Sequence, residues 1–422
     1  MTDFKDLIQP DRGQDAIAIH LVNKSGYDDF AKTLSAGQRA SLAAQKFDGS
    51  GYQVGIVPDG DSFFAVGGVA NVEDMSSWCL AGLAEKLPEG TYRVVDVQPG
   101  PAAFGWLTAQ YRFTRYKDDE NATGPRVLLT DQVGRVPALV AEAEAEMLVR
   151  DLVNTPAEDM GPAALEAEFE KLAKAHGGKL EVTKGDALEQ GYPMVHAVGR
   201  AADRKHAPRL LHLTWGKESD PVLAVVGKGV CFDSGGLDIK PGSGMRLMKK
   251  DMGGAAHAIA LGGLIMGAGL KVRLHLIVPA VENAIAGDAF RPGDVLSSRK
   301  GLSVEIHNTD AEGRLLLGDA LTRASEENPE LVIDFAGRKG HRMTYEAAVE
   351  GLAEGAADGF SGELPSDQLR MLLFCCHPDL PANASVPLTL RLLCGLRTEE
   401  IAAAFFVKRD ALEKRLSRAK AA

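Results

Sequence analysis

The pattern of apolar and polar residues changes twice along this chain and predicts three kinds of segment. In the first 135 residues, short apolar runs alternate with turn-rich strings such as D-G-S-G and P-D-G-D, which predicts strands. Two stretches with apolar spacing close to 3.6 residues predict helices. Strands are expected at 16–22, 53–57 and 62–67, and helices near 26–45 and 76–87. These elements predict a small N-terminal α/β domain at 1–136.

From residue 137 the pattern becomes an alternation of helical segments and apolar runs typical of strands buried on both faces. A connecting helix is expected at 137–154. A second helix, at 163–176, should end at Gly177-Gly178, because glycine readily forms a left-handed C-terminal cap. Strands and helices then alternate, at 223–226, 253–267, 274–278, 313–326 and 331–335. The expected fold class is α/β, with a mostly parallel sheet in a catalytic domain at 137–340.

A third pattern begins near Gly337, where strand-like runs disappear. Residues 345–422 show only helical spacing, which predicts an all-α module at 341–422. The end of this module is basic, with six Lys or Arg residues against two acidic residues between 408 and 420. The whole chain has a formal net charge of -11, which argues against general affinity for nucleic acid. A weak DNA contact is therefore expected only through 398–420.

The composition is that of a globular protein, with 45% hydrophobic and 25% charged residues over 422 positions. Five scattered cysteines without zinc-site spacing are expected to stay reduced. The N-terminal string M-T-D-F-K-D-L-I-Q-P lacks the apolar core of a signal peptide. No apolar run approaches the roughly 20 residues that a membrane span needs. We therefore expect a cytoplasmic protein that does not contact membranes.

Two short clusters carry the candidate chemistry. Lys228 and Asp233 lie in V-G-K-G-V-C-F-D-S-G-G-L-D-I-K-P and Asp251 follows in M-K-K-D-M-G-G, while Asp310 and Glu312 lie in N-T-D-A-E-G-R. If folding brings four carboxylates together, their repulsion calls for a cation, and paired carboxylates around two divalent metals are a common hydrolytic centre. A lysine can join such a site only as a neutral amine, which burial and nearby metal charge favour.

The position of the first cluster fits a binding site. Lys228 and Asp233 follow the predicted strand 223–226, and parallel α/β sheets bind ligands beyond the carboxyl ends of their strands. Any one Asp or Lys is usually a solvated surface charge. The joint pattern of carboxylates, lysines and glycines is what favours a metal centre.

These strings resemble the signature blocks of the leucyl aminopeptidase (M17) family, and the resemblance covers about residues 1–336, including D-L-V-N-T-P-A-E-D-M-G-P. The resemblance implies a cytosolic, homohexameric exopeptidase that uses a metal-bridging hydroxide to release N-terminal residues, leucine-type, from peptides. It also implies two divalent cofactor ions. Manganese and zinc are the expected ions, and magnesium is chemically reasonable as well.

The resemblance also implies roles for individual residues. It gives two ligand sets, one of Lys228, Asp233, Asp251 and Glu312, and the other of Asp233, Asp310 and Glu312. Lys240 would polarise the scissile carbonyl and stabilise the oxyanion that forms on attack. Arg314 would hold a bicarbonate that acts as general base for the bridging water.

The match to this family's pattern stops at Ala336. There the family continues with A-T-L-T-G, whereas this chain reads A-G-R-K-G-H-R-M. The family's later strands, which supply much of the specificity pocket and part of the hexamer contacts, do not follow. The catalytic domain is therefore expected to be truncated, which leaves its activity and its oligomeric state open.

Residues 345–422 resemble region 4 of an extracytoplasmic-function RNA polymerase sigma factor, on strings such as L-P-S-D-Q-L-R-M-L-L-F-C-C-H-P-D-L and L-R-T-E-E-I-A-A-A-F-F-V-K-R-D-A-L-E-K-R-L. This resemblance implies a helix-turn-helix whose recognition helix is 410–421. Its DNA-contacting residues would be Arg409, Lys414, Arg415 and Arg418. An ordinary amphipathic helical pair also accounts for the helical spacing.

Three functions remain open from the sequence. The metal clusters favour a dinuclear metal-dependent aminopeptidase. The C-terminal module favours a DNA-binding regulatory protein. The abrupt change near Gly337 also fits a catalytically impaired chimera, formed by fusion or by a misassembled reading frame.

Overall fold

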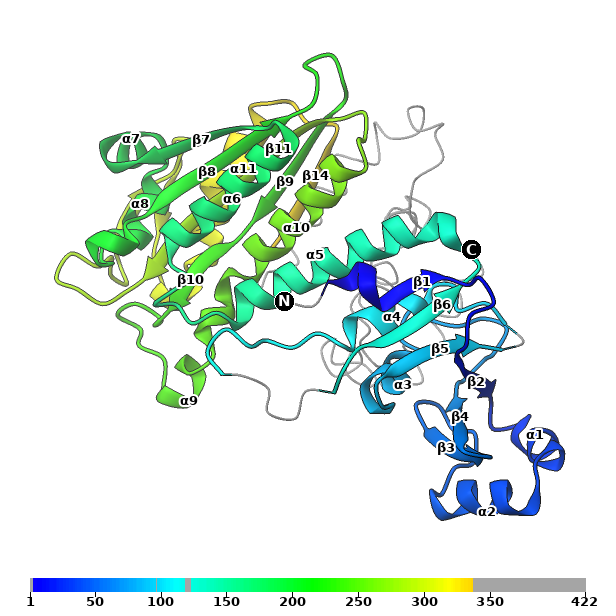
Figure 1. The fold of residues 1–422 in the computed structure, drawn as a ribbon. Helices are drawn as coiled ribbons and strands as arrows, with labels where there is room; N and C mark the ends of the chain where they lie inside the picture. The colour runs from blue at the N-terminus through cyan, green and yellow to red at the C-terminus, as the bar shows by residue number, and fades with distance from the viewer. Residues whose placement is uncertain (1–2, 96, 118–122, 337–422) are drawn as a thin grey trace.

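The computed structural model describes residues 3–95, 97–117 and 123–336, which form two α/β units joined by a long helix (Figure 1). None of the helices in these three ranges combines the length and the apolar character that crossing a membrane requires. The helical module expected at 341–422 lies outside the described residues, as do its four candidate DNA-contacting residues, Arg409, Lys414, Arg415 and Arg418.

The first unit is built on a six-stranded sheet in the order β1-β6-β5-β2-β4-β3. Its strands are β1 (Ile8–Pro10), β2 (Ile17–Val22), β3 (Val54–Asp59), β4 (Ser62–Gly68), β5 (Gly90–Val94) and β6 (Arg126–Thr130). Neighbours pair in parallel except β3 and β4, which form an antiparallel hairpin. The hairpin turns at P-D-G-D, where Gly60 has a φ of 59°. The three strands expected from the sequence are confirmed, whereas β1, β5 and β6 were not predicted.

The helix expected near 26–45 proves to be two helices, α1 (Tyr27–Thr33) and α2 (Ala36–Ala44). Ser35 is extended between them, and its hydroxyl accepts a hydrogen bond of 3.3 Å from the Gln38 N–H. The Gln38 side chain in turn accepts one of 3.0 Å from the Ser35 N–H. This capping box starts a new helix and so explains the break. The remaining helices of the unit are η1 (Phe4–Leu7), α3 (Ala81–Lys86) and α4 (Ala102–Thr108), so the helix expected at 76–87 is shorter than predicted.

The second unit is built on a mixed sheet in the order β14-β9-β11-β8-β7, with β10 also paired to β11. Its strands are β7 (Lys179–Lys184), β8 (Arg209–Trp215), β9 (Val222–Gly227), β10 (Gly229–Asp233), β11 (Arg273–Asn283) and β14 (Leu331–Phe335). β14, β9, β11 and β10 pair in parallel, whereas β8 and β7 are antiparallel. The expected parallel sheet is therefore found in the half that carries the candidate site, and the sequence pattern missed β7 and β8.

Helices cover both faces of this second sheet, as the alternating pattern predicts. They are α6 (Pro162–His176), α7 (Gly185–Gly191), α8 (Pro193–Gly199), α10 (Gly253–Gly267) and α11 (Gly313–Ser325). α6 and α10 share a core with Val225, while α8 and α11 share a core with the next residue, Val226. Successive strand residues point to opposite faces, so each central strand contributes to both cores. α6 ends at Gly177, whose φ of 71° confirms the predicted left-handed cap.

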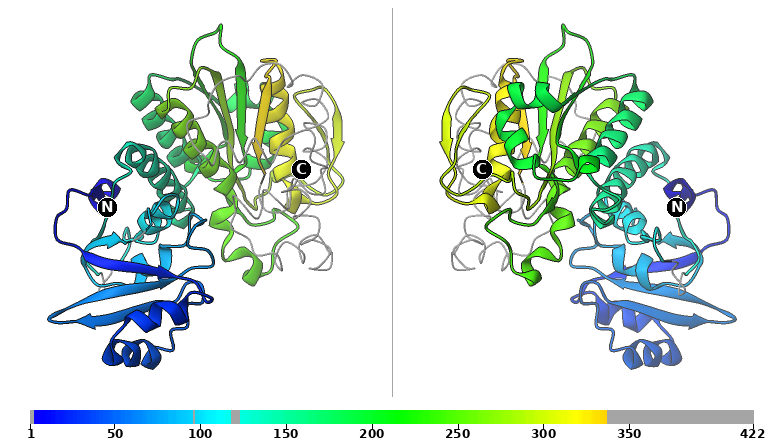
Figure 2. Two further views of the ribbon diagram at one scale, coloured as in Figure 1. Left: turned by 90° about the vertical axis from the view of Figure 1, so that its right-hand side faces the viewer. Right: turned by 90° about the vertical axis from the view of Figure 1, so that its left-hand side faces the viewer.

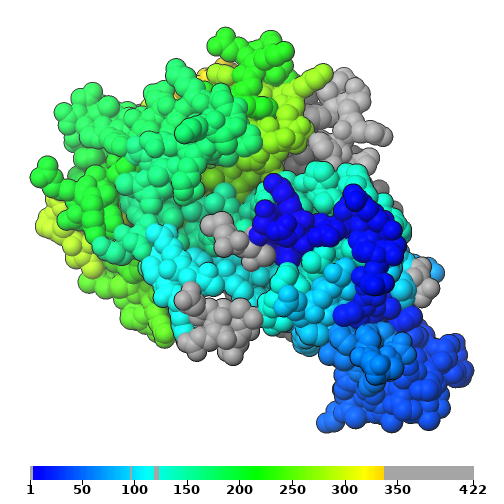
Figure 3. Space-filling view, in the orientation of Figure 1, coloured from blue at the N-terminus to red at the C-terminus, as the bar shows by residue number. Residues whose placement is uncertain are grey.

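α5 (Val136–Asn154) belongs to both units. Leu139 and Ala143, near its start, pack in the core of the first unit, and Val149 and Leu152, near its end, pack in the core of the second. The ribbon views show the helix between the two sheets (Figure 2). In the space-filling view, the part of the first unit that holds α1 and α2 forms a lobe at the far end of the molecule (Figure 3).

Short elements complete the described chain. They are η2 (Val133–Arg135), η3 (Arg204–His206), α9 (Gly242–Met245), η4 (Met248–Met252), β12 (Val295–Ser297), β13 (Ser303–Glu305) and η5 (Thr309–Ala311). β12 and β13 form a separate antiparallel pair. Of these elements, η4 and η5 carry candidate site residues.

Candidate metal centre

The two clusters singled out in the sequence meet at the carboxyl edge of the second sheet. Lys228 directly follows β9, and its backbone N–H donates to the carbonyl of Phe335 at the end of β14 (3.0 Å). Asp233 is the last residue of β10. The chain then turns through Gly235 and Gly236, whose φ angles of 89° and 65° favour glycine. The edge of the sheet thus presents both residues to the same space.

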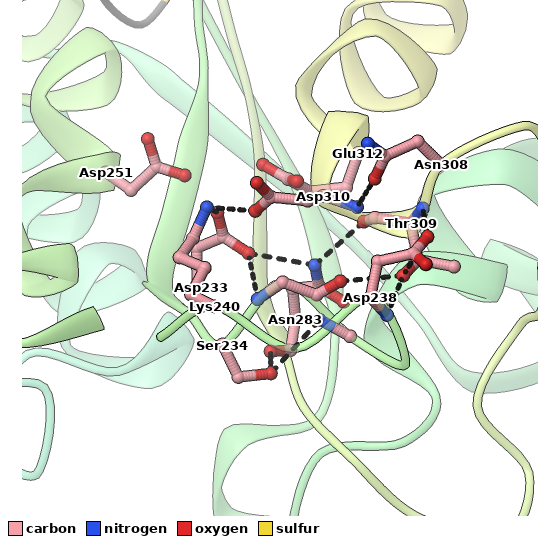
Figure 4. Close-up of polar contacts among 12 residues, drawn as sticks. Asp233, Ser234, Asp238, Lys240, Asp251, Asn283, Asn308, Thr309, Asp310 and Glu312 are labelled. Atoms are coloured by element: carbon pink, nitrogen blue, oxygen red, sulfur yellow. Dashed lines mark hydrogen bonds and ion pairs between the residues drawn. The ribbon is translucent and has the colours of Figure 1, made fainter. Parts of the chain in front are cut away.

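Three further carboxylates reach this space from helical segments. Asp251 lies in η4, just before α10, and Asp310 lies in η5. Glu312 is the N-cap residue of α11 and is 1% exposed. Their carboxylates point towards the end of β10 (Figure 4). The structure therefore brings together all five residues that the sequence proposed as metal ligands.

Two lysines pair with these four carboxylates. Lys228 Nζ lies 2.8 Å from both Asp251 Oδ2 and Glu312 Oε1. Lys240 Nζ lies 2.8 Å from Asp233 Oδ2 and also contacts Asp310 Oδ1. Four carboxylates and two ammonium groups give the cluster a formal charge of -2. This net negative charge would attract additional cations.

Burial and charge act in opposite directions on these groups. Burial by itself would lower the pKa of Lys228, but the carboxylates of Glu312 and Asp251 raise it above its ordinary value. Burial also disfavours the Lys240 ammonium, and hydrogen bonds to Asp233 and Asp310 still raise its pKa. Burial raises the pKa of the Asp251 and Glu312 carboxyls, because their charged forms lose hydration. Additional positive charge nearby would therefore stabilise the charged forms of these two carboxyl groups.

The carboxylates form a set that can hold a metal ion. Asp233, Asp310 and Glu312 each offer one ligand oxygen, and these three atoms lie within 4.8 Å of one another. Within the described part of the chain, the buried Glu312 Oε2 has no hydrogen-bond partner. A buried carboxylate oxygen without a partner is costly unless a cation binds it. All-carboxylate oxygen ligands suit hard divalent ions, so the donor set fits such a cofactor.

A buried network holds the two ligand-bearing segments together, and sequence reasoning missed it. Asn283, the last residue of β11, is fully buried and donates from Nδ2 to Asp233 Oδ1 (2.9 Å) and to the Thr309 carbonyl (3.1 Å). The Gly235 N–H also donates to Asp233 Oδ1 at 2.9 Å. Asp233 Oδ1 is therefore occupied by protein donors, and Oδ2 is the oxygen that faces the cluster (Figure 4).

The same network joins the loop after β10 to η5 directly. Asp238 Oδ2 accepts a hydrogen bond of 2.7 Å from the Thr309 N–H, and Thr309 Oγ1 donates to the Gly235 carbonyl at 2.6 Å. Thr309 itself is fully buried. Asp238 and Thr309 both lie within the two signature strings. Their closeness in the sequence to the candidate ligands could have identified them as site residues.

Arg314 does not join the carboxylate cluster. Its side chain is exposed at the start of α11, where it lines a cavity of about 400 Å³ together with Asn308, Leu302 and Ile306. No ion pair of Arg314 is found within the described ranges. Lys240, the other residue expected to act on substrate, lies within the cluster.

The fold and this centre define a class of protein: an α/β protein with a buried acidic cluster, suited to divalent cations, at the carboxyl edge of parallel strands. Residues 147–349 match the catalytic domain of the cytosol aminopeptidase family, and residues 17–128 match the M17 aminopeptidase N-terminal domain. The chain belongs to the M17 cytosol aminopeptidase family.

Individual relatives agree with this membership. A probable cytosol aminopeptidase from Rhodococcus opacus is 38% identical over 311 residues, which cover 67% of this chain and 60% of that protein. The chain thus spans about three fifths of the length of that relative. The crystal structure of cytosol aminopeptidase from Coxiella burnetii has a TM-score of 0.72 at 38% identity and covers 78% of this chain and 73% of that chain. The bottromycin maturation enzyme BotP in complex with Mn has a TM-score of 0.66 at 28% identity, over 85% of this chain and 83% of its own.

Proposed function

We propose that this chain is a two-metal aminopeptidase that releases N-terminal residues, leucine-type, from peptides. The observation that carries the proposal is the convergence of Asp233, Asp310 and Glu312 around one point of the sheet edge. The unpartnered Glu312 Oε2 and the formal charge of -2 supply an independent reason for cations at this point.

The ligand sets proposed are those that the family resemblance implies. They are Lys228, Asp233, Asp251 and Glu312 for one ion, and Asp233, Asp310 and Glu312 for the other. A pair of bound divalent ions supplies Lewis acidity and lowers the pKa of water held between them. Manganese is the first candidate, since the related BotP structure contains Mn, and zinc also suits such ligands.

Lys240 has the properties required of a group that stabilises developing negative charge. Its raised pKa keeps the side chain protonated, so it remains a charged donor at neutral pH. Asp233 and Asp310 hold it at the centre of the cluster. With divalent ions held by those carboxylates, the Lys240 ammonium group would be available to donate to the carbonyl oxygen of a scissile peptide bond.

Arg314 is the proposed anchor for bicarbonate. A guanidinium group binds planar oxyanions through two parallel N–H donors, and the exposed side chain of Arg314 has no carboxylate partner within the described ranges. Arg314 lies two residues after Glu312 in the chain, at the start of α11. A bicarbonate held there would act as general base for water.

Several wider features belong to the same proposal. We propose domains at 1–136 and 137–340, a cytoplasmic location, peptide substrates and, from the family, a homohexamer. The DNA-binding role of 398–420 stays a prediction from the sequence alone, because those residues lie outside the described ones.

Hydrolysis of a leucine chromogenic amide by the full chain, with and without added Mn²⁺, tests the function. We expect hydrolysis that depends on the metal and that falls at least about a hundredfold in Asp310→Ala, since an essential ion loses a ligand. Asp61→Ala, at an exposed aspartate in the turn between β3 and β4 of the first unit, is the matched control and should keep full activity.

Two outcomes would contradict the proposal: no hydrolysis at any Mn²⁺ or Zn²⁺ concentration, or equal hydrolysis by the native protein and Asp310→Ala. A native protein that binds two Mn²⁺ ions but does not turn over substrate would instead support the catalytically impaired alternative. A Mn²⁺ titration by calorimetry distinguishes that case from failure to bind metal.

A further inference from the structure

The first unit makes contact with the candidate metal centre through the end of α5. Lys249 lies in η4, two residues before Asp251, and its Nζ donates to the carbonyl of Asn154, the last residue of α5. The last carbonyls of a helix have no partner within the helix and carry partial negative charge, so an ammonium group stabilises them. The contact therefore fastens η4 to the end of α5.

On its other side, the end of α5 is fastened to the first unit by Tyr111, which follows α4. The Tyr111 hydroxyl donates to Asp151 Oδ1 at 2.8 Å and accepts from Asn154 Nδ2 at 3.3 Å. Burial raises the pKa of Tyr111 to about 12, so the hydroxyl keeps its proton and remains a donor. Arg150 adds a hydrogen bond of 3.2 Å to the Thr108 carbonyl of α4. Asn154 is thus contacted from both units at once.

The position of Asp251 depends both on its ion pair and on the backbone segment that carries it. In this structure the ion pair between Lys228 and Asp251 orients the Asp251 carboxylate (2.8 Å). The backbone of η4 carries Asp251, so a contact that anchors η4 also bears on where the Asp251 carboxylate lies. η4 itself packs mainly against β10, with further contacts to α5 and α10, and Met252 is buried in the core. The hydrogen bond from Lys249 to the Asn154 carbonyl is the side-chain contact that ties this segment to the end of α5.

We propose that Lys249 is a positioning residue for Asp251, and that the chain of contacts from Tyr111 through Asn154 to Lys249 lets the first unit set the affinity of the Asp251-dependent metal site. This inference rests on the two-metal centre of the proposed function. The first unit contributes no ligand to the described cluster. The inference gives it an indirect role, through metal affinity, in the chemistry of the second unit.

The neighbouring residue supplies a matched control. Lys250 also lies in η4 and is adjacent to Asp251, but its side chain is exposed and has no partner within the described part of the chain. Lys249→Met and Lys250→Met remove the same charge at nearly the same distance along the chain from the ligand. A difference between them therefore reports the contact with Asn154 and not the loss of charge.

The experiment is a stepwise Mn²⁺ titration of the metal-free full chain by calorimetry, with thermal unfolding of each variant measured in parallel. Asp251→Asn first identifies the binding step that depends on Asp251. We expect Lys249→Met to weaken that step about tenfold and to leave the other step unchanged, as for residues that orient metal ligands. Lys249→Arg should restore it, because arginine can donate to the same carbonyl.

Tyr111→Phe tests the far end of the chain of contacts. It should weaken the same step by a smaller factor, whereas Tyr52→Phe, at an exposed tyrosine of the first unit, should have no effect. The inference is overturned if Lys249→Met matches Lys250→Met, or if both steps weaken equally along with the unfolding temperature, which would indicate a purely structural role. A native chain that shows no Mn²⁺ binding overturns the proposed function together with this inference, whereas intact two-step binding in Lys249→Met overturns this inference alone.

Discussion

The side-chain amide of Asn283 donates a hydrogen bond of 2.9 Å to Asp233 Oδ1, and both residues are buried. A second hydrogen bond from the same nitrogen reaches the Thr309 carbonyl. Because both neighbouring atoms are acceptors, only this orientation of the amide satisfies them. Asn283 thereby decides which oxygen of Asp233 is left to face the carboxylate cluster.

Replacing Asn283 should affect both the centre and the fold. Asn283→Ala leaves the buried Thr309 carbonyl short of a donor and Asp233 Oδ1 with one donor fewer. We expect a loss of about 1–3 kcal/mol in the free energy of unfolding, measured by urea denaturation of the metal-free chain. Asn283→Asp changes the side-chain volume very little, but it puts a carboxylate acceptor where Asp233 needs a donor. We therefore expect it to weaken Mn²⁺ binding. Unchanged stability and binding in both variants would show that the amide does not position Asp233.

Removing the ammonium group of Lys228 should be far more costly than removing a surface one. Lys228→Met leaves the Asp251 and Glu312 carboxylates buried without their counter-charge, and breaking a buried pair in this way costs about 3 kcal/mol or more. Lys24→Met is the control, because Lys24 pairs with Asp48 at 3.4 Å with 75% of its side chain exposed. That change should cost less than about 1 kcal/mol. Equal urea midpoints for the two metal-free variants would contradict this reading of the cluster.

Bound metal should stabilise the folded chain through Glu312. An ion that binds only the folded state adds about 2.7 kcal/mol when present at a hundred times its dissociation constant. We expect added Mn²⁺ to raise the unfolding temperature of the native chain, and a chelator to reverse the rise. Glu312→Gln should lose most of the effect, because Glu312 belongs to both proposed ligand sets. If added Mn²⁺ raised the unfolding temperature of Glu312→Gln by the same amount, the stabilising ion would not be one that Glu312 binds.

The buried pair of His212 and His275 predicts how stability depends on pH. Their ring nitrogens lie 3.0 Å apart on adjacent strands, and burial, with Arg323 and His275 nearby, lowers the pKa of His212 to about 3. The unfolded chain binds a proton here near pH 6.5, while the folded chain stays neutral, so the unfolded state binds more protons below that pH. The contribution of His212 is therefore fully present above about pH 6.5 and is lost as the pH falls towards 3.

Urea unfolding between about pH 7 and pH 5 measures this dependence, which for one proton reaches about 1.4 kcal/mol per pH unit. His212→Gln should make the dependence shallower by up to that amount. His307→Gln, at an exposed histidine, should leave the slope unchanged. If His212→Gln keeps the native slope, the histidine does not stay neutral in the folded chain.

Local patterns were enough to predict much of the second unit. β14 at 331–335 and α10 at 253–267 coincide with the expected ranges, because a continuous apolar run and a regular helical spacing are each complete in the local sequence. The split of the helix near 26–45 was missed, although Ser35 and Gln38 are a readable capping signal. β7 and β8 were missed because their pairing depends on distant strands and not on a distinctive local period.

The sequence by itself determined which residues form the candidate metal centre. Lys228, Asp233, Asp251, Asp310 and Glu312 stand in short strings whose residue types and spacing suffice to indicate metal chemistry. Only the tertiary structure decided what holds them. β11 continues five residues past the expected end at 278, because its pairing with β10 persists to Asn283, and that register brings the amide beside Asp233. The contacts of Asn154 with Tyr111 and Lys249 likewise join residues 43 and 95 positions apart. No local pattern records such contacts, because they depend on how α5 packs between the two units.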